Sequence, residues 1–136
     1  MMRSIFVVMA SIFLFVGTTP ACAGEPAEGE STSLVVLIYD TQCKWACDAV
    51  RPIMQELKEK HKDAFSYMEL NATQDQLEES KKLAKQNGIS WFLEDYSQFV
   101  PVVGIFNARR KCVKYLLGKK EKEVYAAALE KALQCK

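Results

Sequence analysis

Two cysteines, Cys43 and Cys47, have the residue type and spacing best suited to chemistry in this chain. Residues 34–39 before them form a continuous aliphatic and β-branched run, typical of a strand buried on both faces. Residues 49 to about 61 after them carry apolar side chains at helical spacing. A thiol pair where a strand meets a helix indicates either redox chemistry or the binding of a soft metal ion.

The two thiols are expected to differ in role. The partial positive charge of a helix N-terminus stabilises a thiolate, and Lys44 adds a nearby cation. Cys43 precedes the helix and should be the more exposed thiol, so we expect it to be the nucleophile and Cys47 to be the resolving thiol. Within a regular helix their Cβ atoms would lie about 5–6 Å apart, beyond the ~3.5–4.5 Å of a disulfide. A bond between them therefore requires Cys43 to leave helical geometry.

The chain has 136 residues, 49% of them hydrophobic, with 18 basic and 17 acidic side chains. This length suits one domain, which we expect to be a monomer without a cofactor or a metal ion. The near-balanced charge and the lack of a long basic run argue against a nucleic-acid partner.

Residues 1–23 have the three-part pattern of a signal peptide: a start with Arg3, an apolar run over 5–16, and the cleavage pattern Ala21-Cys22-Ala23. The apolar run is shorter than the ~20 residues that span a bilayer, so we expect no stable membrane span after cleavage. The protein is then periplasmic or secreted, where disulfides persist. Cys22 leaves a lipoprotein as an alternative. Residues 24–33 are predicted to be a flexible tether, and 34–136 the folded domain.

The rest of the domain alternates between strand and helix patterns. A strand is predicted over 65–70, a helix over 73–87, a hairpin of two strands over 101–106 and 111–117, and a last helix over 121–133. Residues 90–99 are unusually aromatic. The order predicts an α/β protein with a mixed sheet, because a strand-helix-strand unit gives parallel strands and a hairpin gives antiparallel ones.

This order, with thiols at the first strand-to-helix joint, resembles the thioredoxin fold. Pro52, five residues after Cys47, matches the proline that kinks this family's first helix. Residues 99–106 (Phe-Val-Pro-Val-Val-Gly-Ile-Phe) resemble the segment in which a cis-proline opens the third core strand and faces the thiols. The resemblance covers about residues 33–133 and implies a central mixed sheet flanked by helices.

The resemblance implies an exported thiol-disulfide oxidoreductase that acts on the thiols and disulfides of partner proteins through Cys43 and Cys47. A cis Val100–Pro101 bond would expose backbone that binds an extended substrate, and Trp45, between the thiols in sequence, is expected to contact the substrate as well. Cys112 and Cys135 are expected to be neighbours in such a fold. A structural disulfide between them would close a loop of about 24 residues and contribute ~3 kcal/mol in the chain-entropy model. The alternative is a pair of unpaired core cysteines.

The sequence departs from the family at three places. Counting back from Pro52 puts Lys44 where the family has its first cysteine, so Cys43 is displaced by one residue. Leu37 stands where the family has a buried acid in its first strand. Residues 90–99 resemble an insertion, whose rings Trp91, Phe92 and Tyr96 would form with Trp45 either an apolar rim that selects a partner or a cover for the sheet edge.

Three other functions remain open on these residues. Cys43 and Cys47 could form an inert disulfide or be buried thiols. The C-x-x-x-C spacing also resembles SCO-type copper chaperones, in which two thiolates and a distant histidine bind Cu(I). His61, the only histidine, is predicted at the far end of the first helix, where a cation suits the helix dipole. The third possibility is a redox-inactive interaction domain.

Overall fold

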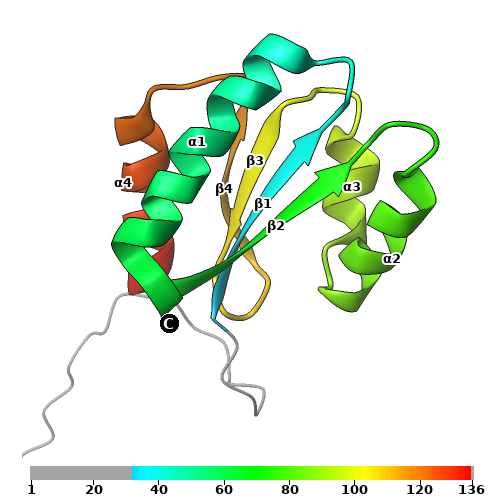
Figure 1. Cartoon of the computed structure of the whole chain (residues 1–136). Helices are drawn as coiled ribbons and strands as arrows, with labels where there is room; N and C mark the ends of the chain where they lie inside the picture. Colours follow the sequence, from blue (N-terminus) through cyan, green and yellow to red (C-terminus); the bar gives the residue numbers. More distant parts are fainter. Residues whose placement is uncertain (1–31, 136) are drawn as a thin grey trace, which may run out of the picture.

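The computed structural model describes residues 32–135. The predicted signal peptide and the predicted tether as far as residue 31 lie outside the described residues. Within them the elements follow the predicted order (Figure 1): β1 (Ser33–Tyr39), α1 (Lys44–His61), a 3-10 turn (Lys62–Ala64), β2 (Phe65–Asn71), α2 (Leu77–Gln86), α3 (Ser90–Tyr96), β3 (Val102–Phe106), β4 (Cys112–Leu117) and α4 (Lys122–Gln134). No helix in this part of the chain is long and apolar enough to cross a membrane.

The four strands form one mixed sheet in the order β2-β1-β3-β4. β1 runs parallel to β2, and the connecting segment between them contains α1. β3 lies antiparallel to β1 and also to β4, which completes the predicted hairpin. The predicted α/β architecture with a central mixed sheet is therefore confirmed.

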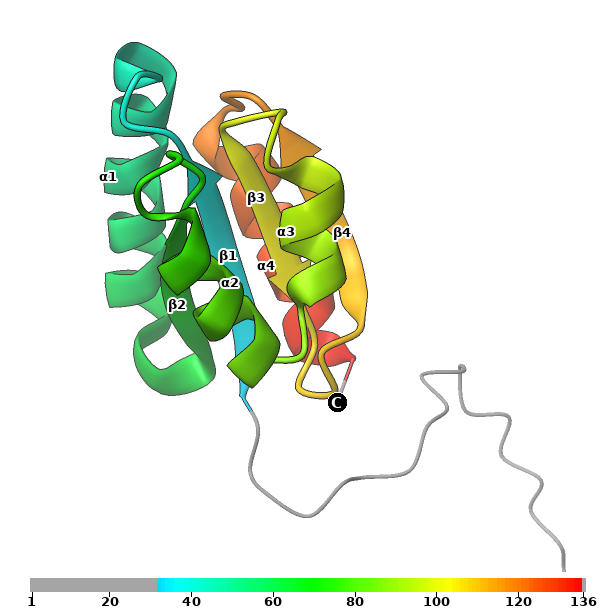
Figure 2. The ribbon, with the colours of Figure 1, turned by 90° about the vertical axis from the view of Figure 1, so that its right-hand side faces the viewer.

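Helices cover both faces of the sheet: α1 and α4 lie on one face, and α2 and α3 on the other (Figures 1 and 2). Because side chains alternate along a strand, β1 sends Val35 and Leu37 toward α1 and α4, and Val36 and Ile38 toward α2 and α3. All four are buried, which explains why the strand is apolar without interruption.

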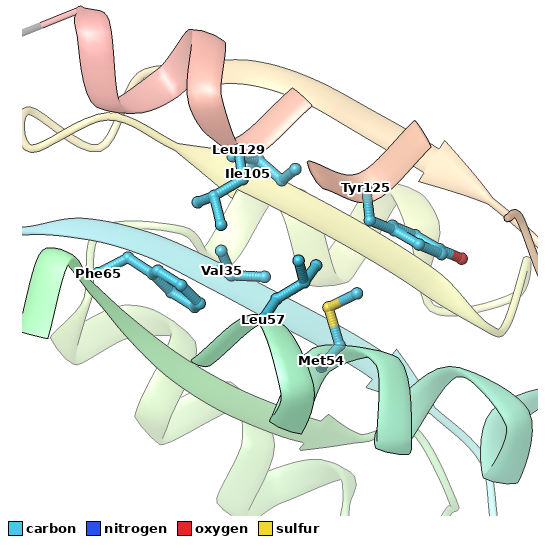
Figure 3. A pocket seen from close by; sticks show the side chains of 7 residues that line it. All are labelled: Val35, Met54, Leu57, Phe65, Ile105, Tyr125 and Leu129. Carbon is cyan, nitrogen blue, oxygen red and sulfur yellow. The ribbon is translucent and has the colours of Figure 1, made fainter. Parts of the chain in front are cut away.

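The core beneath α1 and α4 contains one small cavity of about 10 Å³ (Figure 3). Apolar side chains form most of its wall, namely Val35, Met54, Leu57, Phe65, Ile105, Tyr125 and Leu129. The volume is at the lower limit for one water molecule, and a water needs polar partners to stay. The cavity is therefore a packing gap in the core and offers no room for a ligand.

α1 begins at Lys44, directly after Cys43, as expected for a helix that Cys43 precedes. Two other features differ from the sequence-based expectation. α2 begins at Leu77 instead of residue 73, since the Asn71 side chain accepts a hydrogen bond from the Thr73 backbone and forms a turn there. Residues 90–96, read only as an aromatic insertion, form α3.

Candidate functional site

Cys43 occupies the position just before α1 and has non-helical dihedral angles, φ −84° and ψ 58°. A turn holds it there: its N–H donates to the Asp40 carbonyl at 3.1 Å, and the Asp40 side chain accepts from the Gln42 N–H at 2.8 Å. Cys43 therefore lies outside helical geometry, as a disulfide with Cys47 requires at this spacing. Both thiols lie at the N-terminal end of α1, where the helix dipole favours negative charge.

The two thiols differ in exposure as expected. Cys43 is partly exposed, whereas only 1% of Cys47 is accessible to solvent. Burial of the Cys47 sulfur raises its pKa to about 11, and the hydrogen bond with Cys43 adds to this shift; a hydrogen bond from the Asp40 backbone and the charge of Arg51 oppose it. Cys47 is thus a protonated thiol near neutral pH, and Cys43 is the sulfur that a partner can reach. The two thiols are near each other but not joined.

The Val100–Pro101 peptide bond is cis, as the resemblance implies. It lies beside the thiols, because the Cys43 sulfur is 3.9 Å from the Val100 carbonyl oxygen and donates a weak hydrogen bond to it. Figure 1 shows the same neighbourhood: the loop before α1 and the loop before β3 lie at one end of the molecule. Pro101 itself is buried, and its carbonyl accepts from the Gly118 N–H at 2.8 Å.

The aromatic side chains are divided between this site and the core. Trp45 is 78% exposed next to Cys43, and Phe99, which precedes Val100, is half exposed. Phe92 is fully buried, and Trp91 packs edge-on against Phe92 and against Phe106 at the far end of β3 from Pro101. For Trp91 and Phe92 the packing favours the second of the two alternatives, a cover for the sheet, over the apolar rim. The rim considered from the sequence did not include Phe99. The position of Phe99 just before Val100 and the cis bond could have indicated that it lies near the thiols.

A second group that sequence reasoning missed surrounds Arg51, one turn after Cys47. Its Nε donates to Glu69 of β2 at 3.0 Å, and its guanidinium lies 4.1 Å from the centre of the Tyr39 ring. The Tyr67 hydroxyl donates to the other oxygen of Glu69 at 2.8 Å. No local pattern reveals this cluster, because α1, β1 and β2 each contribute part of it.

The expected Cys112–Cys135 disulfide is not formed, since the Cys112 thiol is free. Strict alternation along β4 would place Cys112 on the same face as Leu116, beneath α4. A β-bulge at Ile105/Phe106 shifts the register, so that Cys112 pairs with Phe106 and packs on the α2 and α3 face instead. Cys135 follows α4, which covers the opposite face.

His61 is the last residue of α1, whereas the thiols are at the first turn, so the structure does not bring this imidazole to the sulfurs. It packs near Phe65 instead, with ring centres 6.3 Å apart. Among residues 32–135, no three histidine, cysteine or acidic side chains are grouped so that they could hold a metal ion.

Comparison with known proteins gives a match by structure alone. No protein-family model and no curated protein sequence matches this chain. A thiol:disulfide interchange protein of the thioredoxin family from Chlorobium tepidum TLS superposes with a TM-score of 0.53 at 16% identity, over 76% of this chain and 81% of that one. A malarial protein superposes with the same TM-score at 14% identity, over 75% of this chain and 98% of that one.

The class that these observations define is the thioredoxin-like fold, and this chain has that fold. At such low sequence identity the structural similarity establishes the fold alone. The activity has to be inferred from the residues of the site.

Proposed function

We propose that this chain is an exported thiol-disulfide oxidoreductase that acts on partner proteins through Cys43 and Cys47. One observation carries the proposal: a partly exposed thiol at a helix N-terminus contacts the carbonyl next to a cis-proline, with a buried second thiol in hydrogen-bond range. The activity named for the Chlorobium tepidum neighbour is of the same kind.

The reaction follows from the different exposure of the two sulfurs. The Cys43 thiolate attacks a partner disulfide, forms a mixed disulfide and expels the partner's other sulfur as a thiolate. Cys47 then loses its proton to water, and its thiolate attacks the Cys43 sulfur. The mixed disulfide breaks and the partner leaves as a dithiol. The partner has then been reduced by two electrons, and Cys43 and Cys47 have been oxidised to a disulfide. The same steps in reverse oxidise a partner dithiol.

The partner would bind as an extended segment beside the thiols. The Val100 carbonyl already reaches the Cys43 sulfur, so a chain aligned there places its own sulfur next to the nucleophile. Trp45, two residues after Cys43 in α1, supplies an exposed apolar side chain for the partner. Together with Pro101, these residues form the proposed substrate-binding surface of a monomer.

The proposed site of action is the periplasm or the extracellular space, with Cys22 leaving a lipid anchor as the alternative. This part of the proposal rests on the signal-peptide pattern of residues 1–23. Protein thiols and disulfides are the partners expected in such an oxidising compartment.

A redox titration of Cys43 and Cys47 against glutathione buffers tests the proposal, with peptide mapping to assign each thiol. A reversible two-electron midpoint for this pair supports an oxidoreductase, and Cys112→Ser serves as a control that should keep it. A pair that never oxidises, or one that stays oxidised in strong reductant, would contradict the activity. Tight binding of one Cu(I) without a reversible midpoint would favour the metallochaperone instead.

A further inference from the structure

Arg51 is held in one direction by groups from three elements. Its Nε donates to Glu69 of β2 at 3.0 Å, and its Nη1 donates to Asp48 of α1 at 3.3 Å. Its guanidinium stacks over Tyr39, the last residue of β1, at 4.1 Å from the ring centre. The Arg51 side chain is only 30% exposed. A long and flexible side chain with this many contacts is ordered, so its charge occupies a defined place.

Arg51 lies one helical turn after the resolving thiol in α1, and its charge acts on that sulfur. Helical side chains lean toward the N-terminus, over the residues three and four positions earlier. For Arg51 these are Asp48, which it contacts, and Cys47. Burial and the hydrogen bond with Cys43 raise the pKa of Cys47, while the Asp40 backbone and the Arg51 charge lower it. Arg51 is thus the side chain whose charge favours the Cys47 thiolate.

Glu69 holds the cation in place from the strand β2. One of its oxygens accepts from Arg51 and the other from the Tyr67 hydroxyl at 2.8 Å. Burial and the bond to Glu69 raise the pKa of Tyr67, so this hydroxyl stays a donor. Burial disfavours the charge on Arg51, but the hydrogen bond to Glu69 and the charge interactions with Glu69, Tyr39 and Asp48 together outweigh it and raise the Arg51 pKa. The guanidinium therefore stays charged at every pH at which the thiols react.

We propose that Arg51, held by Glu69 and Tyr39, is a positioning residue whose charge supports the Cys47 thiolate during its attack on the Cys43 sulfur. This inference rests on the proposed function. In that step the Cys47 proton goes to water, the Cys47–Cys43 bond forms, and the bond from Cys43 to the partner breaks. Negative charge begins on Cys47, where a nearby cation favours it most. The titratable groups that act on this sulfur are Cys43, Asp40 through its backbone, and Arg51. Around Arg51 and its partner Glu69 lie Asp48, Tyr39 and Tyr67.

Arg51→Met removes the charge and keeps most of the side-chain length, and Arg51→Lys restores the charge. Arg51→Gln also removes the charge. If one of these two variants fails to fold, the other still tests the inference. Lys81→Met removes an exposed cation on α2 that pairs with Glu78, and it serves as the matched control. All are compared as purified protein, with thermal unfolding measured first.

The first measurement is the pH profile of Cys47 alkylation in a Cys43→Ser background, read by peptide mass spectrometry. Loss of the Arg51 charge should move the midpoint up by as much as about one pH unit, which lowers the thiolate fraction near neutral pH about three- to tenfold. Arg51→Lys should recover most of this shift, and Lys81→Met should leave the midpoint in place. An unchanged midpoint in both Arg51→Met and Arg51→Gln overturns the inference.

The second measurement follows the reduced protein after addition of oxidised glutathione, with acid quenching and intact mass. Arg51→Met should accumulate the glutathione mixed disulfide on Cys43 and close the internal disulfide about three- to tenfold more slowly. Closure at the wild-type rate contradicts the role of Arg51 and leaves the oxidoreductase standing. If the wild-type protein never closes the Cys43–Cys47 disulfide, the proposed function fails, and the inference fails with it.

Discussion

The Cys43 sulfur lies 3.9 Å from the carbonyl oxygen of Val100, although the two residues are 57 positions apart in the chain. The contact joins the loop that follows β1 to the loop that leads into β3, and these two strands are hydrogen-bonded neighbours in the sheet. It places the partly exposed thiol beside the backbone that would pair with an extended partner under the proposed function. In that proposal Cys43 is the sulfur that meets the partner because of its position as well as its exposure.

Replacing the resolving thiol should trap the partner. In Cys47→Ser, Cys43 can still attack a disulfide, but no second sulfur is there to release the product. We expect a stable mixed disulfide with a peptide disulfide substrate, visible by non-reducing gel and intact mass. Cys43→Ser should form little of it, because Cys47 is only 1% exposed. Equal trapping by both variants would refute the assignment of the two roles.

The order of the elements along the chain and the place of the thiols could be predicted because local patterns carry them. The uninterrupted apolar run of β1 requires cover on both faces, and the spacing from Cys47 to Pro52 aligns the chain with a known fold. The cis bond at Pro101 followed from that alignment. These features depend on residues close together in sequence.

What could not be predicted depends on registers between separate elements. The pairing of Leu37 with Glu69 across β1 and β2 decides that Arg51 of α1 meets a carboxylate, and no single segment encodes it. A β-bulge decides the face on which Cys112 lies, because one extra residue reverses the alternation of side chains. The same limit applies to Trp91 of α3, which packs on Phe106 of the separate strand β3.

The stability of the reduced protein should fall at alkaline pH through Cys47. Its pKa is about 11 in the folded state, raised from 9.0, so the folded chain holds this proton more tightly than the unfolded chain does. The stability gained is complete below pH 9 and is lost as the pH rises toward 11. Urea unfolding at several pH values measures this loss.

Tyr67 and Cys112 also have raised pKa values through burial and contribute in the same range, so the Cys47 part must be isolated. Cys47→Ala provides this comparison, because it removes the titrating group from a buried position. The difference in unfolding free energy between wild type and Cys47→Ala should shrink from pH 8 to pH 11. A difference that stays constant over this range would show that Cys47 does not titrate as its burial requires.

Gly104→Ala should destabilise the fold, because the strand passes directly beneath an aromatic ring. A Cβ at Gly104 would lie 2.5 Å from Phe92 Cζ and 2.8 Å from Phe106 Cε2, both fully buried. Overpacking of this kind costs about 1–3 kcal/mol, measured by urea unfolding. Phe92→Leu makes room at the same point, so the double variant should lose less than the sum of the two single changes. Strict additivity would contradict the contact.

The exposed aromatic side chains should separate into one that contacts the partner and one that packs on the fold. Trp45 is 78% exposed beside Cys43, so Trp45→Ala should leave thermal stability almost unchanged but lower kcat/KM for a peptide disulfide several-fold. Trp91 is 42% exposed and packs on Phe92 and Phe106, so Trp91→Ala should lower stability by about 1–2 kcal/mol with kcat/KM preserved. Both tryptophans are partly exposed, so the pair controls for the simple loss of an indole. If Trp91→Ala slowed the reaction as much as Trp45→Ala in a folded protein, partner contacts would extend along α3 to the far end of β3.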